Sequence, residues 1–379
     1  MDTSREDART QTGPGAGGGT RAAHDPTGVL DEALERLHAA GPERLGWLTN
    51  HGPMAVEALV HGDRAATVHR WLDHYRDKLE DMPPETRPID PAAWHDALGD
   101  PARLGDWPAY FARELEARPW REVLAEWWPR LLPGLAGAAT HTVIRAGHAV
   151  RTLEATEAAG GTAGGPRLAE LAHALGYWAA RYARLPSAPV PAGTATPDAA
   201  LAAVPAVPAQ SGGIRERLAQ LTPEATPGWP AAVGALAPAG TPEEARAALA
   251  GLVRAAVHRY AAYGHGEPVM LVHAATAPNA VLRALPALPR ELWLPSYAAA
   301  WAASAAVTAA YGPADPLPPE RVPAPPAGDA AAAADELRTR AAAHGDEHAI
   351  KFVDTALDVG DDTARAAALQ SVALIDPAF

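Results

Sequence analysis

Helical periodicity is the feature that most narrows the folds open to this chain. From about residue 28 onward, apolar side chains recur three and four positions apart, as in Trp120, Val123, Leu124 and Trp127. This spacing places them on one face of an α-helix. The chain has neither sustained alternation of apolar and polar residues nor Asn-Gly hairpin turns, which are the usual signals of β-strands. The pattern predicts an all-α fold, organised as a single large multi-helical domain.

Capping signals locate two of the helices that matter most. The segment Thr241-Pro242-Glu243-Glu244 is a capping box with proline at the first helical position, and it predicts a helix that reaches Tyr263. Asp346 follows a glycine and is placed to cap a helix that contains His348 and Lys351. These capping residues therefore predict where the two helices begin.

Composition divides the chain into a tail, a domain and its connections. Residues 1–27 are polar and Gly-rich, and we expect a disordered N-terminal tail there, followed by the α-helical domain over residues 28–379. Pro/Ala-rich surface connections are expected at about residues 186–230 and 313–328, the first with at most one short helix, near Ile214 to Leu221. We recognise neither a membrane-spanning stretch nor a signal peptide, so we expect a cytoplasmic protein.

Residue usage excludes several classes of site. The 379 residues include no cysteine, which rules out disulfides, thiolate zinc sites and iron–sulfur clusters, so any metal must bind nitrogen and oxygen ligands. The net charge of -13 disfavours nucleic acid and anionic membranes as partners. Glycine-rich nucleotide fingerprints are absent.

His61-Gly62-Asp63 has the spacing of a two-histidine-one-carboxylate iron site, but we expect Asp63 to cap a helix instead.

Four histidines stand at helix entrances or among apolar residues, at His51, His141, His273 and His348. Taken singly, such a histidine is more often a core or capping residue than a ligand. As a set in a chain without cysteine, they fit a nitrogen-rich site for iron, and less specifically for zinc, manganese or copper. Both interpretations remain open on the residues alone.

The helix that begins near His141 carries further polar groups. At 100° per residue, His141, Arg145 and His148 fall on one stripe, which should face the interior. The two histidines are separated by about 10 Å along the helix axis, which is long for ligation of one ion by both. One could be a ligand and the other its neighbour, or both could be core histidines bonded to the backbone.

Lys351 is one of only two lysines in the chain. It follows His348 by three positions, so both project from one face of a helix, in its first turn. The helix dipole and burial there both disfavour an ammonium. A neutral lysine amine can take up carbon dioxide to become a carbamate, an oxygen ligand, whereas arginine stays protonated. The alternative is a lysine that extends its ammonium into solvent.

Five segments resemble, in order, the successive motifs of the questin oxidase family. They are Asn50-His51-Gly52-Pro53-Met54-Ala55, Trp127-Trp128-Pro129-Arg130-Leu131-Leu132-Pro133-Gly134, Ala139-Thr140-His141-Thr142-Val143-Ile144-Arg145, His273-Ala274-Ala275-Thr276 and His348-Ala349-Ile350-Lys351. The resemblance runs from about Gly28 to Ala373.

The resemblance implies an α-helical oxygenase of polycyclic aromatic ketones such as anthraquinones. Family members are associated with Baeyer–Villiger-like oxygen insertion and ring opening, with NADPH for some. Related ring-cleaving members are non-heme iron enzymes with four histidines and a carboxylated lysine, and the matching positions here are His51, His141, His273, His348 and Lys351. His148, where fungal relatives have tyrosine, and Arg145 are then the candidates for catalytic groups beside the metal.

We therefore expect a non-heme iron monooxygenase or dioxygenase of specialised metabolism, with a small aromatic or quinone-like substrate and dioxygen as partners. One alternative is a metal-free, NADPH-dependent Baeyer–Villiger-type monooxygenase, and another is a non-catalytic helical scaffold. Five tryptophans could supply a stacking wall for the planar substrate, although core packing is the more common role for most of them: Trp94, Trp107, Trp120, Trp127 and Trp128.

Overall fold

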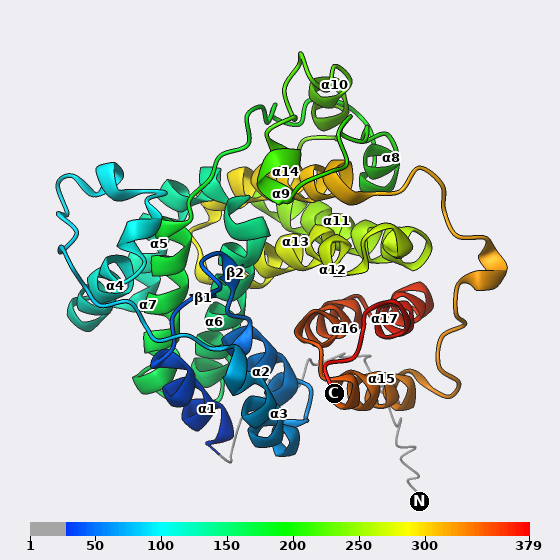
Figure 1. The fold of residues 1–379 in the computed structure, drawn as a ribbon. Helices are drawn as coiled ribbons and strands as arrows, with labels where there is room; N and C mark the ends of the chain where they lie inside the picture. Colours follow the sequence, from blue (N-terminus) through cyan, green and yellow to red (C-terminus); the bar gives the residue numbers. More distant parts are fainter. Residues whose placement is uncertain (1–27) are drawn as a thin grey trace, which may run out of the picture.

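The computed structural model describes residues 28–379, which fold into α-helices joined by turns and by both short and long loops (Figure 1). The predicted all-α fold class is confirmed. The one sheet in the described residues is a hairpin of β1 (Glu43–Arg44) and β2 (Leu48–Thr49), which pair antiparallel. The sequence did not indicate this hairpin, because strands of two residues are too short to show alternation. The tail expected over residues 1–27 lies outside the described residues.

The first half of the chain forms one side of the molecule. Its helices are α1 (Val29–His38), α2 (Gly52–His61), α3 (Val68–Tyr75), α4 (Asp106–Ala117), α5 (Trp120–Leu131), α6 (His141–Ala158) and α7 (Gly165–Ala180). Helix α7 packs against α1, α4 and α6, and α6 continues the contact to α13 in the second half. This side therefore meets the rest of the molecule through α6.

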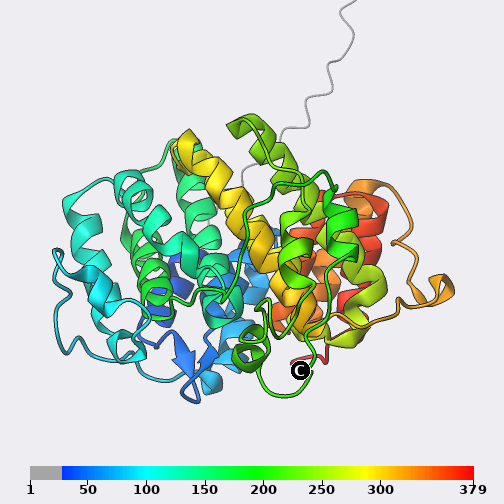
Figure 2. The ribbon, with the colours of Figure 1, turned by 90° about the horizontal axis from the view of Figure 1, so that it is seen from above.

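The second half of the chain surrounds α13. Its helices are α8 (Pro197–Ala202), α9 (Ile214–Leu218), α10 (Trp229–Gly234), α11 (Pro242–Tyr263), α12 (Pro268–Leu271), α13 (His273–Ala284), α14 (Trp293–Tyr311), α15 (Ala330–His344), α16 (Glu347–Val359) and α17 (Asp362–Leu374). Helix α13 packs against α6, α11, α14 and α16. Seen from above, α14 runs between the first-half helices and the C-terminal helices (Figure 2).

Local capping chemistry explains where the important helices begin. The Thr241 side chain accepts a hydrogen bond from the Glu244 N–H at 3.2 Å, and α11 runs to Tyr263 as predicted. Asp346 accepts from the N–H groups of His348 and Ala349, which confirms the predicted cap of α16. A side-chain oxygen at the N-cap satisfies N–H groups that the first helical turn leaves unpaired.

Two local predictions were wrong. The connection over residues 186–230 contains α8 as well as the expected α9, and α10 begins at its end. These helices have five or six residues each, too few for the apolar repeat to become visible. Asp63 does not cap a helix: its φ of 58° puts it in a left-handed turn after α2.

The buried apolar residues form one core that runs through both halves of the molecule. Trp107, Trp127 and Trp128 are fully buried in it, Trp120 is nearly so, and Trp94 packs edge-on against Trp127. The core interpretation is therefore confirmed for these four, which offer no open wall to a planar ligand, while Trp94 is partly buried. Among the described helices, none is long and apolar enough to span a bilayer.

Candidate metal centre

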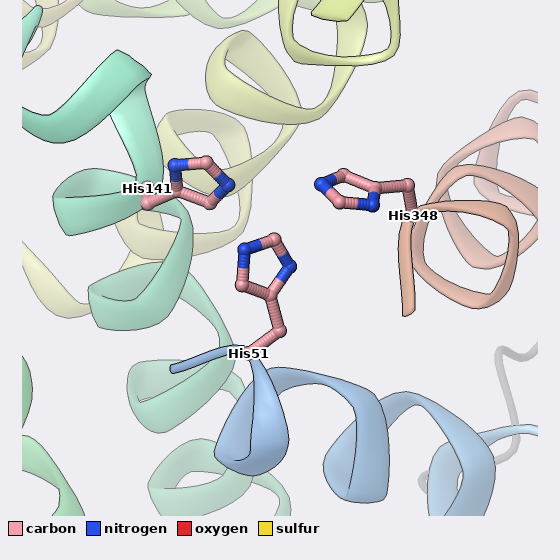
Figure 3. A group of neighbouring side chains, drawn as sticks. All are labelled: His51, His141 and His348. Atoms are coloured by element: carbon pink, nitrogen blue, oxygen red, sulfur yellow. The ribbon is translucent and has the colours of Figure 1, made fainter. Parts of the chain in front are cut away.

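Histidines from four separate helices meet in the interior. His51 directly precedes α2, His141 and His273 are the first residues of α6 and α13, and His348 is the second residue of α16. Their exposed fractions lie between 0% and 9%. The rings of His51, His141 and His348 face one another (Figure 3), and one nitrogen from each lies within 4.8 Å of the other two.

His273 joins this group through His141. Their ring centroids are 4.4 Å apart and their Nε2 atoms 2.9 Å apart. The His273 ring centroid also lies 5.5 Å from that of His348. The structure therefore brings together all four histidines that the sequence singled out, and we call them the four-histidine cluster.

The hydrogen bonds of His141 and His273 define which nitrogens are free. Nδ1 of His141 lies 2.6 Å from the Ala138 carbonyl, and Nδ1 of His273 lies 3.0 Å from the Met270 carbonyl. A carbonyl only accepts, so each Nδ1 must carry the hydrogen, and each Nε2 of a neutral ring then presents a lone pair. Two lone pairs that face each other at 2.9 Å repel unless a cation lies between or beside them.

A proton shared between the Nε2 atoms of His141 and His273 does not act as the cation that their lone pairs require. Burial, followed by the neighbouring histidines and Lys351, holds the pKa values of His51, His141 and His273 well below the ordinary 6.5. The rings are therefore neutral near pH 7, and neutral imidazole is the form that binds metals. Donation of Nδ1–H to a backbone carbonyl is also the usual way in which a ligating histidine is oriented.

The turn before α6 holds His141 in place at a cost in backbone strain. Ala138, Ala139 and Thr140 have φ values of 47°, 55° and 68°, in the left-handed region that residues other than glycine rarely occupy. Each such residue costs on the order of 1–3 kcal/mol, and strain of this kind concentrates at functional sites. The strained turn aims the Ala138 carbonyl at His141 Nδ1.

Lys351 belongs to the same group of buried side chains. Its Nζ lies 3.1 Å from His51 Nδ1, and the residue is 1% exposed. The alternative in which the ammonium reaches solvent is therefore wrong. Burial lowers the pKa of Lys351 to about 8, against the opposing effect of Glu347 and Asp346. A lower pKa increases the neutral amine, the form that can take up carbon dioxide. Carboxylation itself stays a prediction.

The donor set fits a metal ion. It offers four imidazoles and an amine able to become an oxygen ligand, a set suited to iron, zinc, manganese or copper. Buried polar atoms without a hydrogen-bond partner in the described residues include the hydroxyls of Thr140, which precedes His141, and of Thr276, which follows His273 by three positions. Such unsatisfied atoms are rare in folded proteins, and these two belong to residues that lie close to cluster histidines in the chain.

A second polar layer lies further along the same four helices. Six or seven positions after each histidine, and again ten positions after it, each helix carries a polar residue. These are Glu57 and His61 on α2, His148 and Arg151 on α6, Asn279 and Arg283 on α13, and Asp354 and Asp358 on α16. We call these eight residues the ion-pair layer.

Arg151 and Asp354 are at the centre of the ion-pair layer. Arg151 binds Glu57 through Nε at 2.8 Å and binds Asp354 at 3.0 Å, and Arg283 reaches Asp354 at 2.7 Å. Burial alone would raise the pKa values of both carboxyls, but Arg151 and His148 at Glu57, and Arg151 and Arg283 at Asp354, outweigh it and hold both values far below the ordinary range. The layer thus cross-links α2, α6, α13 and α16 and keeps their histidine-bearing ends together.

The two candidate catalytic residues have partners outside the four-histidine cluster. His148 Nδ1 lies 2.6 Å from Glu57, and Arg145 binds both oxygens of Glu170 at 2.6 and 2.8 Å. Within residues 28–379, no hydrogen bond or ring contact joins either of them to the cluster. Sequence reasoning missed Glu57 and Glu170. A charged residue inside the apolar helix 54–60 was a signal for Glu57.

The buried imidazoles that the facing helices of this all-α protein bring together are compatible with a metal held in the interior of a helical bundle. A family model described as questin oxidase-like matches residues 49–203. This part of the chain, which contains His51 and His141, is therefore questin oxidase-like, and the resemblance is confirmed. The motifs at His273 and His348 lie beyond the match. The family implies an oxidoreductase of the oxygenase or oxidase kind. No curated protein matches the chain.

Proposed function

We propose that this protein is a non-heme iron oxygenase that uses dioxygen to oxidise or cleave a ring of a polycyclic aromatic or quinone-like substrate in specialised metabolism. The observation that carries the proposal is the contact between His141 Nε2 and His273 Nε2, two buried lone-pair donors 2.9 Å apart. A bound cation relieves their repulsion, and the family match supports oxygen chemistry at that cation.

The residues that would hold iron are His51, His141, His273, His348 and, as a carbamate, Lys351. Bound iron supplies the redox chemistry that activation of dioxygen requires. The protein contributes neutral imidazoles fixed by backbone carbonyls, and a buried site from which bulk water is excluded. The N-terminal ends of α2, α6 and α16 lie at the cluster, and their positive dipole ends favour an anionic ligand such as the carbamate.

Metal analysis of untagged protein, purified from iron-supplemented cells, tests the proposal first. We expect about one iron ion per chain on the four-histidine cluster. Turnover of an anthraquinone panel under labelled dioxygen should then place the label in a product. Protein reloaded with zinc is the matched control and should bind metal without turnover, because zinc has no redox chemistry.

The alternatives give different results in the same experiments. Turnover that needs NADPH and persists in metal-free protein would support the Baeyer–Villiger-type monooxygenase. NADPH that is needed only with iron present would instead be the reductant of the iron site. Protein that holds no metal and oxidises nothing would support the helical scaffold. Unchanged turnover in strictly anaerobic buffer would overturn the oxygenase proposal.

A further inference from the structure

A cavity of about 710 Å³ opens between the β1–β2 hairpin, the end of α7 and helix α9. This volume lies within the range of roughly 300–1,000 Å³ that small-molecule sites occupy. These three elements come from widely separated parts of the chain, as their colours in Figure 1 show. We call this cavity the hairpin cleft.

The strained turn before α6 links the hairpin cleft to the four-histidine cluster, although no cluster histidine is among the residues that line the cleft. Ala138 and Ala139 line the cleft, and the Ala138 carbonyl is the group that accepts the hydrogen bond from His141 Nδ1. A ligand in the cleft therefore contacts the segment that orients a cluster histidine. Because this segment is strained, with both alanines left-handed, a contact there can shift the histidine.

The cleft wall combines apolar side chains with exposed charged ones. Ile214 and Leu218 supply apolar surface, and Trp47, which is 67% exposed, supplies a flat ring. Arg184 and Arg215 also line the cleft and are exposed, and within residues 28–379 no hydrogen bond or ion pair occupies either side chain. Arginines stack on flat rings and bind carboxylates and similar anions.

These guanidinium groups stand out against the charge of the whole chain. The formal net charge is -13, so an organic anion is repelled from most of the surface. A third arginine of the wall, Arg181, is neutralised by Glu43, which leaves Arg184 and Arg215 as its unpaired cations, against the one exposed carboxylate of Glu216. Local cations in an otherwise acidic protein raise the concentration of an anionic ligand where they lie.

We propose that the hairpin cleft is the substrate site of the four-histidine cluster, and that it takes an organic anion with a flat, unsaturated body. The flat body lies against Trp47 and the apolar wall, and the anionic group faces Arg184 and Arg215. The assignment as substrate site rests on the proposed function, whereas the binding of such an anion can be measured without turnover.

Equilibrium dialysis of the full-length protein as purified tests the proposal, with anthraquinone-2-carboxylate as probe and 2-(hydroxymethyl)anthraquinone as its neutral counterpart. The carboxylate should bind more tightly. Arg184→Gln and Arg215→Gln should each weaken its binding roughly threefold, as expected for exposed charge pairs, and leave the neutral probe unchanged. Ala219→Trp, which fills the cleft from an exposed position, should abolish binding of both probes.

Matched variants control for other sites. Ala188→Trp adds the same ring at an exposed position outside the cleft wall. Arg246→Gln removes a cation from a second cavity of about 560 Å³, beside α11 and α14. Both variants should bind the two probes as the wild type does. Full binding to Ala219→Trp, or loss of binding in Arg246→Gln, would overturn the assignment of the site.

The remaining outcomes separate the two proposals. Equal binding of both probes, with no effect of either arginine substitution, would overturn the anionic class. Wild-type protein that holds iron but binds neither probe would overturn the cleft and leave the proposed function standing. Protein that binds the carboxylate in the expected pattern but holds no metal would support the cleft as a binding site and overturn the proposed function.

Discussion

His141 and His273 face each other through Nε2 atoms 2.9 Å apart, while each donates its Nδ1–H to a backbone carbonyl. Metal binding should remove this repulsion and therefore stabilise the fold. We expect chelation to lower the melting temperature, since a metal at 1,000 times its dissociation constant contributes about 4 kcal/mol. His141→Ala and His273→Ala should lose metal and the response to chelator while circular dichroism shows unchanged helix content. Full metal occupancy in both variants would remove this cluster from consideration.

Lys351 should act as an oxygen ligand after carboxylation. Lys351→Arg should lose as much metal as Lys351→Ala, because a guanidinium keeps its proton and repels the metal. Lys351→Glu should retain more metal than either, since it supplies an anionic oxygen with a shorter reach. Carbon-13 NMR of protein equilibrated with labelled carbon dioxide should show a carbamate signal that Lys351→Arg lacks. A metal-loaded wild type without this signal would leave a site of histidines alone.

Gly147 sets the approach of α6 to α13, the helices that carry His141 and His273. A Cβ at Gly147 would lie 2.6 Å from the Ala280 Cα and Cβ atoms, so Gly147→Ala should push the helices apart. Overpacking of this kind costs typically about 1–3 kcal/mol, and metal affinity should fall as the two Nε2 atoms separate.

Gly251→Ala is the matched control for Gly147→Ala. Gly251 lies within α11, and a Cβ there would meet only the Pro197 side chain, at 3.8 Å. This substitution should leave metal binding unchanged and stabilise the helix by up to about 1 kcal/mol. Denaturant unfolding and chelator competition measure the two effects. Equal behaviour of both variants would contradict the role given to Gly147.

Arg151→Met should destabilise the fold and loosen the metal site together. It removes the group that joins Glu57 to Asp354 in the buried ion-pair layer, and breaking a buried pair costs about 3–5 kcal/mol. Arg340→Met breaks the exposed pair with Glu336 on α15 and should cost no more than about 1 kcal/mol. If chelator competition gives the same metal affinity for both variants, the layer does not position the histidines.

Glu170 should make the fold sensitive to acid. Burial alone would raise its pKa, but Arg145 and then His38 outweigh it and lower the pKa from 4.5 to about 2. Because the folded value lies below the ordinary one, the ion pair stabilises the fold fully above about pH 4.5, and this stabilisation is lost as pH falls towards 2. A shift of this size corresponds to about 3 kcal/mol.

Unfolding free energies measured between pH 6 and pH 2 check this expectation. Glu170→Gln should be less stable at pH 6, because Arg145 loses its carboxylate, and should show a shallower decline towards acid. His38 also contacts Glu170, and His173 stacks on His38. Neither histidine is therefore substituted in the variants that are compared. Glu122→Gln, at an exposed position, should keep the wild-type slope. A wild-type slope in Glu170→Gln would contradict the assignment.

The sequence predicted the members of the four-histidine cluster better than their arrangement. Each histidine stood out because its neighbours are apolar or because it opens a helix. The contacts between them join residues 132 positions apart, as for His141 and His273, and apolar periodicity reports only on the helix in which it occurs. The metal site itself stays a prediction.

The sequence contained one sign of the ion-pair layer but did not indicate its pairing. The pairing of Arg151 with Glu57 and Asp354 spans 94 and 203 positions, and no local pattern indicates it. A shared offset was visible, however, since a polar residue follows each cluster histidine by ten positions. On several helices, a charged residue follows a candidate ligand by the same number of positions. Such an offset, in helices with buried charges, would have predicted that these helices pack side by side.

His51 and Lys351 touch although 300 positions separate them in the chain. A ribosome must therefore synthesise nearly all the described residues before the last donors can join the first ones. A nascent chain that exposes only His51 and His141 offers an incomplete site, on which a metal would bind weakly and without selection. Metal acquisition should consequently follow synthesis of α16, and truncations before α16 should accumulate as metal-free protein in cells.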